Sequence, residues 1–311
     1  MAEPTTAPAE RVAVAVVTYN RAELLPLMLD GLAAQARRPD AVIVIDNAST
    51  DDTPAVLAAR AQAGDLPLQV VRLADNTGGS GGFHEGMRLA YEQGFDRIWL
   101  MDDDVVPAPD CLAVMMGHDL PCLMATREDR QGVLMELSAT RFDLRTPWVP
   151  KPKRASVAST YASRAEMPEL VPLDVVAFEG FLVQRRVIDV IGLPDPTFFI
   201  FYDDADFAIR ARRAGFPIYA VRDAVVVRQL DFSQQHDLAS WKGRYMYRNL
   251  FVVHFRHGEN ALVRAKPYAI SAGVVALSPL RGGRREAANV IRAIREARGM
   301  RAMPGSGPSA G

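Results

Sequence analysis

The chain has 311 residues, of which 49% are hydrophobic and 23% charged, and its formal net charge is -1 at neutral pH. This composition is typical of a globular protein with a sizeable core, and the balanced charge argues against a nucleic-acid partner. Two cysteines are too few for a disulfide framework or a cysteine-bound zinc site.

Both ends of the chain differ in composition from the rest. Residues 1–10 are rich in Pro, Ala and Thr, and residues 302–311 in Gly, Pro and Ser, so we expect both to be disordered. The first residues lack the basic and apolar segments of a secretory signal. No apolar stretch near the C-terminus approaches the ~20 residues of a membrane-spanning helix. We therefore expect a cytoplasmic protein.

Apolar runs and helical patterns alternate through the first hundred residues. Four apolar, largely β-branched runs at residues 12–18, 41–45, 68–73 and 97–101 predict buried strands. Between them lie helix-capping residues, a proline near a helix start and leucines at helical spacing. Short links of this kind imply parallel strands joined by right-handed crossovers. The sequence therefore predicts an α/β fold, with a mostly parallel sheet flanked by helices.

The second half of the chain has a less regular pattern. Residues 147–163 are polar and basic and contain three prolines, which indicates a loop or an inserted β-hairpin. Further elements are expected at 174–183 (strand), 207–214 (helix), 217–221 (strand), 238–255 (helix) and 286–298 (basic helix). From residue 255 to 301, Lys and Arg outnumber Asp and Glu by ten to three, so we expect a basic helical region at 256–301.

Two acidic clusters each follow an apolar run. Asp102, Asp103 and Asp104 end the fourth strand, and Asp203 and Asp204 follow an aromatic run about a hundred residues later. Three adjacent carboxylates repel one another, so a cation would hold them at a strand end, and a second acidic group could move a proton. Without those roles, the first cluster is a solvated acidic turn and the second caps a helix.

A glycine-rich segment, residues 76–82 (NTGGSGG), lies at a predicted strand–helix junction. Its glycines would let a diphosphate approach free backbone N–H groups, although a tight turn explains them equally well. The segment fits neither the G-x-G-x-x-G motif nor a lysine-bearing P-loop, which argues against NAD binding and ordinary NTPase chemistry. Asp46, directly after the second strand, either accepts from a nucleobase or a ribose hydroxyl or forms a turn.

Four segments occur in an order that resembles the family-2 glycosyltransferases, which are inverting enzymes of the GT-A fold. They are residues 16–21 (VVTYNR), 45–51 (IDNASTD), 76–82 (NTGGSGG) and 101–104 (MDDD). Together with residues 201–207 (FYDDADF), they are similar to bacterial galactofuranosyltransferases, with rhamnosyltransferases next. The resemblance covers residues 11–255 and implies a nucleotide-binding half, 11–104, and an acceptor half, 105–255.

The resemblance implies roles for individual residues. Those expected to line the nucleotide-sugar pocket are Thr18, Tyr19, Asn20, Arg21, Asp46, Asn76, Gly78, Gly79 and Asp103. Asp46 would read the uracil ring. Asp102 and Asp104, the outer members of a D-x-D motif, would bind Mn²⁺ or Mg²⁺ against the diphosphate of the donor. Asp204 would be the general base, with Asp203 beside it.

One position departs from the family pattern. Relatives supply a histidine as a third metal ligand, and spacing from Trp241 places Gln229 there. We expect His236, seven residues later, to take this role, with Gln229 or a water as the alternative. Glu179 and Trp241 are expected on the acceptor side, where Glu179 would bind an acceptor hydroxyl or else face solvent.

These assignments predict a metal-dependent inverting glycosyltransferase. It would move galactofuranose, or next rhamnose, from a UDP- or dTDP-sugar to a hydroxyl of a glycan or polyprenyl-linked acceptor. Two other classes stay open: a non-catalytic sugar-nucleotide or glycan-binding module, prompted by the missing histidine, and a nucleotidyltransferase. The basic region at 256–301 either lies on anionic lipid at the inner face of the membrane or is a solvated helix face.

Overall fold

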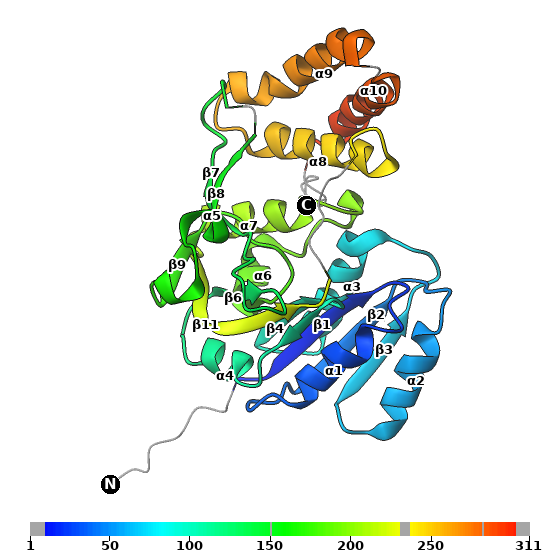
Figure 1. Ribbon diagram of the computed structural model, residues 1–311, viewed down its shortest axis with the longest axis vertical. Helices are drawn as coiled ribbons and strands as arrows, with labels where there is room; N and C mark the ends of the chain where they lie inside the picture. Colours follow the sequence, from blue (N-terminus) through cyan, green and yellow to red (C-terminus); the bar gives the residue numbers. More distant parts are fainter. Residues whose placement is uncertain (1–9, 150, 231–236, 282, 303–311) are drawn as a thin grey trace, which may run out of the picture.

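The computed structural model describes residues 10–149, 151–230, 237–281 and 283–302 (Figure 1). His236 and all but one residue of each predicted disordered end lie outside these described residues. Within them, no helix combines the length and the apolarity needed to cross a membrane.

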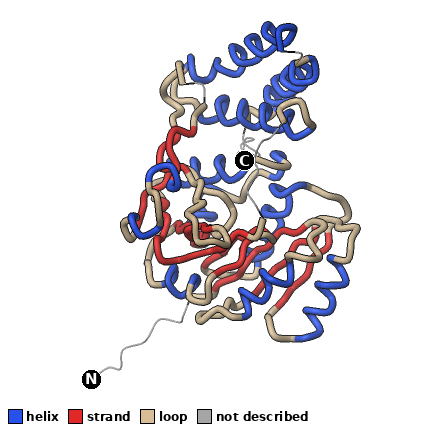
Figure 2. Tube along the Cα trace, viewed as in Figure 1, coloured by secondary structure: helices blue, strands red, loops and turns tan. Residues whose placement is uncertain are grey.

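The first hundred residues form the parallel half of one sheet, as the alternating pattern predicts. Its strands are β1 (Val12–Thr18), β2 (Ala41–Asp46), β3 (Leu68–Arg72) and β4 (Arg97–Asp102), in the order β3-β2-β1-β4. The crossover helices are α1 (Leu25–Ala33), α2 (Thr53–Ala63) and α3 (Gly78–Glu92). Every residue of β1 and β2 is buried, because helices cover both faces of the sheet (Figure 2).

The second half of the sheet is mixed. Its strands are β5 (Val105–Pro107), β6 (Cys122–Glu128), β9 (Leu170–Leu173), β10 (Phe181–Gln184) and β11 (Ile218–Arg228). β10 lies antiparallel between β4 and β6, β11 runs parallel to β6, and β5 and β9 pair antiparallel with β11. The α/β fold class is confirmed, but among the described residues beyond the first four strands only the β6–β11 pair is parallel.

A separate hairpin lies beside the sheet. β7 (Ala139–Phe142) pairs antiparallel with β8 (Lys153–Ser156). The segment 147–163 therefore supplies one strand of a hairpin whose other strand precedes it, and a short helix follows at 157–160. The remaining short elements are α4 (Cys111–Met116), α5 (Val157–Thr160), α6 (Arg185–Ile191), α7 (Asp203–Arg213) and the 3-10 turns η1 (Arg164–Glu166) and η2 (Pro196–Phe198).

Alternate residues of β1 supply two apolar cores on opposite faces of the sheet. One core contains Ala13 and Ala15 together with Phe83 of α3, and the other contains Val14 together with Leu25 of α1. This alternation follows from the two-residue repeat of a strand that is covered on both sides. The two cores fix where β1 and β4 end, and the polar residues that follow those strands form the candidate site.

The C-terminal residues form a helical layer that lies over α7 rather than over the sheet (Figure 1). It comprises α8 (Trp241–His257), α9 (Ala261–Arg281) and α10 (Arg284–Gly299), which pack on one another. A third core joins Phe251 of α8 and Val290 of α10 to Ile209 of α7. The predicted helical region at 256–301 therefore includes a long helix, α9, besides the basic helix.

Candidate active site

Polar residues from three adjacent strands meet at one edge of the sheet. In the register of the parallel strands, Thr18 pairs with Asp46 across β1 and β2, and Val17 pairs with Asp102 across β1 and β4. The carboxyl ends of parallel strands lie at the same edge, where ligands of open α/β sheets bind. The motifs that the sequence separates by tens of residues are therefore neighbours.

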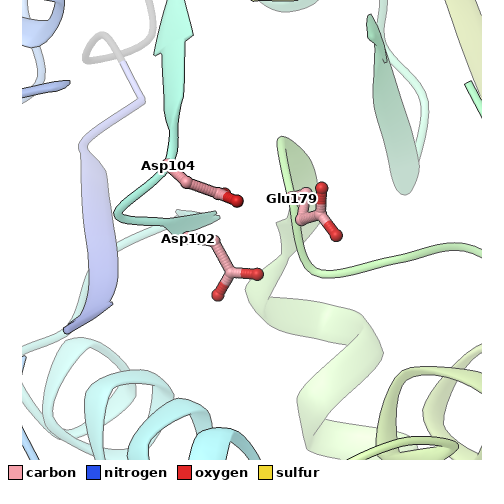
Figure 3. A group of neighbouring side chains, drawn as sticks. All are labelled: Asp102, Asp104 and Glu179. Atoms are coloured by element: carbon pink, nitrogen blue, oxygen red, sulfur yellow. The ribbon is translucent and has the colours of Figure 1, made fainter. Parts of the chain in front are cut away.

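Three carboxylates converge beside this edge (Figure 3). Ligand oxygens of Asp102, Asp104 and Glu179 all lie within 4.8 Å of one another. Asp102 ends β4, and Asp104 lies in the turn before β5. Glu179 reaches them because β10 runs antiparallel beside β4, pairing Phe181 with Leu100, so the start of one strand meets the end of the other.

The surroundings of this cluster disfavour its negative charge. Burial raises the pKa of Asp102 well above its usual range, and the nearby charges of Glu179 and Asp104 add to the effect. The pKa of Asp104 is also raised, by burial first and then by Glu179. Burial likewise raises the pKa of Asp103, to about 6. A bound cation would relieve this repulsion.

Two arginines balance part of the charge. Arg127, itself almost fully buried, forms an ion pair with Glu179. Arg228 Nη1 lies 3.8 Å from Glu179 Oε2, and Arg228 Nη2 lies 3.3 Å from Asp104 Oδ2. Burial alone would raise the pKa of Glu179, but the charges of Arg127 and Arg228 outweigh it and lower that pKa. Glu179 therefore lies in one cluster with Asp102 and Asp104 and does not face solvent.

The donor set fits a hard divalent cation. Oxygen ligands from carboxylates are those that Mg²⁺ and Mn²⁺ prefer. Within the described chain, the buried Oδ1 of Asp104 has no hydrogen-bond partner. Gln229 also lies beside this residue, since its backbone N–H donates to the Asp104 carbonyl at 2.8 Å, but its side-chain amide donates to the Val227 carbonyl at 3.0 Å. The expected ligand His236 lies outside the described residues.

The second acidic cluster begins α7. Burial and the neighbouring charge of Asp203 raise the pKa of Asp204 to about 8, and burial raises that of Asp203 to about 6. The charge of Glu179 also raises the pKa of Asp204. A carboxyl group with such a pKa has the basicity that a general base needs near neutral pH.

Asp206 has a different, structural role. Its carboxylate accepts from His257 Nε2 at 2.8 Å and from Arg210 Nε at 2.9 Å, and Arg256 lies 3.4 Å away. Although burial opposes it, these partners lower the pKa of Asp206 to about 2. Asp206 therefore joins α7 to the end of α8.

The residues expected around the nucleotide surround the ends of β1 and β2. Asp46 is buried, and its Oδ1 accepts from the Ser49 N–H at 2.9 Å. Asn20 Oδ1 accepts from the Thr50 N–H at 2.7 Å, which links the two strand ends. The Thr18 hydroxyl is buried without a hydrogen-bond partner among the described residues.

Three further expected pocket residues lie at the same edge. Tyr19 is 43% exposed, and its N–H donates to Asp103 at 3.4 Å. Arg21 Nε lies 3.5 Å from an oxygen of Asp103. Asn76 Oδ1 accepts from the Gly78 N–H at 2.8 Å, at the start of the glycine-rich helix α3. These residues therefore lie near the carboxyl end of β1.

The two glycines differ in what the fold demands of them. Gly78 has a φ of +73°, and a Cβ there would lie 2.0 Å from the Phe199 carbonyl oxygen. A Cβ on Gly79 would meet nothing within 4 Å. Gly78 is therefore required by the close approach of the segment that carries Asp203, whereas the fold leaves room for a side chain at Gly79.

Asn47 and the two arginines of the cluster, Arg127 and Arg228, were not singled out from the sequence. Asn47 accepts from the Thr77 N–H at 2.8 Å and donates to the Gly78 carbonyl at 2.9 Å, so it ties the glycine-rich turn to β2. Its signal was an amide directly after a strand. Arg127 balances the negative charge of Glu179. The sequence signal that could have identified it is a charged residue within the apolar run of a strand.

Trp241, expected on the acceptor side, lies at the start of α8. It is 59% exposed and packs edge-to-face on Phe199 and Tyr245, with ring centroids 6.4 and 6.0 Å apart. Phe199 belongs to the segment that leads to Asp203. Trp241 therefore contacts the segment that precedes the second acidic cluster.

Comparison with known proteins adds to this geometry. The family described as Glycosyl transferase family 2 matches residues 13–119. Galactofuranosyltransferase GlfT1 of Mycobacterium tuberculosis (strain ATCC 25618 / H37Rv) is 33% identical over 219 residues, which are 69% of each chain. Galactofuranosyltransferase GlfT1 of Mycolicibacterium smegmatis is 32% identical over 211 residues, 67% of each chain.

Solved structures share the fold. A mannosyltransferase from Pyrobaculum calidifontis, in complex with GDP-Man and Mn²⁺, is 20% identical with a TM-score of 0.56, over 95% of this chain and 88% of that one. GalNAc-T7, with UDP, GalNAc and Mn²⁺, is 13% identical with a TM-score of 0.61, over 89% of this chain and 54% of that one. The GT-A fold expected from the sequence is confirmed.

Proposed function

This chain belongs to glycosyl transferase family 2, near its galactofuranosyltransferase branch, and we propose that it transfers galactofuranose. The donor would be UDP-galactofuranose, and the acceptor would be a hydroxyl of a glycan or of a lipid-linked molecule. A dTDP-rhamnose donor is the second candidate, because pocket shape rather than motif order decides between these sugars. Sugar transfer from a nucleotide donor is the activity of the family. The particular sugar rests on the identity to GlfT1.

The observation that carries the proposal is the convergence of three carboxylates beside the ends of β1 and β4. Asp102, Asp104 and Glu179 would hold Mn²⁺ or Mg²⁺, and the cation would neutralise the charge of the departing nucleoside diphosphate. Glu179 would be a third ligand, because its carboxylate completes the oxygen cluster, while the expected ligand His236 lies outside the described residues. Arg127 and Arg228 hold that carboxylate in place.

Asp204 would carry the proton transfer. It would accept the proton of the acceptor hydroxyl while the acceptor oxygen bonds to the anomeric carbon. The bond from that carbon to the diphosphate breaks on the opposite face of the sugar, so the anomeric configuration inverts. Burial, and then the charge of Asp203 beside it, raise the pKa of Asp204 to about 8, which suits this role.

The donor would lie across the ends of β1 and β2. Asp46, buried beside the Ser49 N–H, would accept from the uracil ring, and Asn20 and Arg21 would complete the wall. The backbone at the start of α3 would face the diphosphate, since N–H groups at a helix N-terminus favour anions. These assignments follow from the shared edge of the parallel strands.

A lipid surface is the proposed partner of the helical layer. Every outward-facing residue of α9 from residue 265 to 280 is uncharged, and Leu280 and Leu277 are 83% and 43% exposed. Trp148, 84% exposed, lies next to Val149, whose carbonyl accepts from Lys266 of α9. Exposed Trp and Leu beside the exposed arginines of α10 suit an anionic membrane surface. An acceptor carried on a lipid would be delivered there.

Turnover by an Asp204→Asn variant tests the proposed chemistry. The amide cannot accept the proton, so release of UDP from UDP-galactofuranose in the presence of acceptor should fall by about 10²–10⁴-fold while UDP binding persists. Asp223→Asn, on the exposed side of β11, is the matched control. Unchanged turnover would contradict the role of Asp204 as the base. UDP binding without turnover in the wild-type protein would favour a binding module, and release of pyrophosphate instead of UDP would indicate a nucleotidyltransferase.

A further inference from the structure

The segment that leads to Asp204 has an unusual backbone. Five non-glycine residues have a left-handed φ in the described chain, and three of them lie here: Phe199 (64°), Phe201 (69°) and Tyr202 (68°). A residue with a Cβ adopts this region only at a conformational cost, so contacts from elsewhere must hold the segment. Asp203 and Asp204 follow at once, as the first residues of α7.

Asn249 of α8 supplies the first of these contacts. Its side chain is fully buried, and its amide nitrogen donates to three carbonyl oxygens. These belong to Phe198, Ile200 and Phe201, at 2.9, 2.7 and 2.9 Å. The carbonyl groups of a left-handed segment cannot pair with one another in a helix or strand, so a buried donor must satisfy them.

Arg248 continues the same arrangement. One nitrogen of its guanidinium donates to the carbonyls of Thr197 and Phe198, at 2.8 and 2.6 Å. Its Nε donates to Asn249 Oδ1 at 2.8 Å, which fixes the orientation of the amide. The two side chains therefore act together on residues 197–201.

Tyr245, which precedes Arg248 by one turn of α8, makes a third contact with the segment. Tyr245 stacks on Phe199 with ring centroids 5.0 Å apart, and the Arg248 guanidinium lies 4.6 Å from the centroid of the Tyr245 ring. The Phe199 carbonyl in turn accepts from the Ser80 N–H of the glycine-rich helix at 3.1 Å. One face of α8 thus holds the segment between the donor side of the site and the candidate base.

We propose that Arg248 and Asn249 are positioning residues of the transfer reaction. By pairing with the carbonyls of residues 197–201, they hold the left-handed segment that delivers Asp204 to the site. The inference rests on the proposed role of Asp204 as the base. If Arg248 and Asn249 position the base, then α8 of the C-terminal helical layer contributes to the transfer reaction as well as to stability.

The test separates positioning from binding. In Asn249→Ala, kcat for UDP-galactofuranose should fall about 100-fold, because a reacting group displaced by about 1 Å has that effect. The donor KM and the Kd of UDP with Mn²⁺ should stay at their wild-type values, since the donor pocket lies on β1 and β2. Arg248→Lys keeps the charge but loses the forked geometry, so its kcat should fall less.

Asn289→Ala is the matched control. Asn289 of α10 also donates to two carbonyls, those of Leu238 and Ser240 at 2.9 and 2.8 Å, but these do not belong to the segment before Asp204. Its loss should lower the melting temperature and leave kcat per folded molecule unchanged. A purely structural role for Asn249 predicts the same outcome for both variants.

Three results would overturn the inference: wild-type kcat in a folded Asn249→Ala protein, a kcat loss that Asn289→Ala reproduces, or a donor KM that changes as much as kcat. If Asn249→Ala does not fold, Arg248→Lys decides by the same criteria. Asp204→Asn is assayed in parallel. If Asp204→Asn retains turnover, the proposed function fails. If Asp204→Asn is inactive but Asn249→Ala keeps wild-type kcat, only the positioning role of Asn249 fails.

Discussion

Asp204 is a buried carboxyl group whose pKa is raised to about 8 by burial and by Asp203 beside it. A base must be deprotonated to act, so kcat/KM should fall as the pH is lowered through about 8. A bound divalent cation adds positive charge nearby and lowers the pKa, whereas the anionic diphosphate of the donor opposes this effect, so the acid limb should lie at or below pH 8. A pH–rate profile measures this limb, and a pH-independent rate between 6 and 9 would contradict the assignment.

Glu179 should contribute to metal affinity, because its carboxylate completes the oxygen cluster with Asp102 and Asp104. Glu179→Gln removes a charged ligand, so the affinity for Mn²⁺, measured by calorimetry on the protein without donor, should fall by at least about tenfold. Glu128→Gln, at the end of β6 and paired with Arg164 instead, is the control. Equal Mn²⁺ affinities in the two variants would return Glu179 to an acceptor-side role.

Gly78 and Gly79, the first two residues of α3, differ in their importance for the fold. Gly78→Ala forces a Cβ against the Phe199 carbonyl at a left-handed φ, whereas Gly79→Ala meets nothing. Gly78→Ala should lower the free energy of unfolding by more than the ~1 kcal/mol of the backbone change alone, and Gly79→Ala should be neutral or slightly stabilising. Denaturant unfolding measures both. Equal stabilities would mean that the Phe199 segment can move away from α3.

The elements that the sequence predicts well are those with local signals. The runs in β1, β2 and β4 show continuous apolar character because both faces of each strand are buried. Asp102 and Asp104 could be singled out because their signal lies within three residues. The role of Glu179 could not, since it depends on the antiparallel insertion of β10 beside β4, a pairing between residues far apart in the chain.

Contacts between distant elements account for the other omissions. Asn249 appears in the sequence as one polar residue in a helix, and only the folded chain shows three carbonyls around its amide. Asn47 likewise gains its role by meeting the glycine-rich turn. Trp241 was expected near an acceptor, and the structure places it against Phe199, on the segment that precedes Asp204.

At the scale of the whole molecule, the exposed face of α9 between residues 265 and 280 is uncharged, unlike that of an ordinary solvated helix. Leu277→Asp with Leu280→Asp should reduce co-sedimentation with vesicles that contain anionic lipid, because apolar burial and charge attraction together supply membrane binding. Val190→Asp, at another exposed apolar position, on α6, should have no effect. Equal sedimentation of both variants would contradict the lipid surface. Concentration-dependent dimers by light scattering would assign the face to a second copy.

Binding of UDP in the presence and absence of metal tests the central claim most directly. Calorimetry with Mn²⁺ should show one UDP site, and EDTA or Asp104→Asn should weaken the binding strongly, because the cation joins the acidic cluster to the diphosphate. A preference for dTDP would favour rhamnose as the sugar. UDP binding that is equally tight in EDTA, or absent under both conditions, would contradict the assignment of Asp102, Asp104 and Glu179 as the site of a metal-dependent transferase.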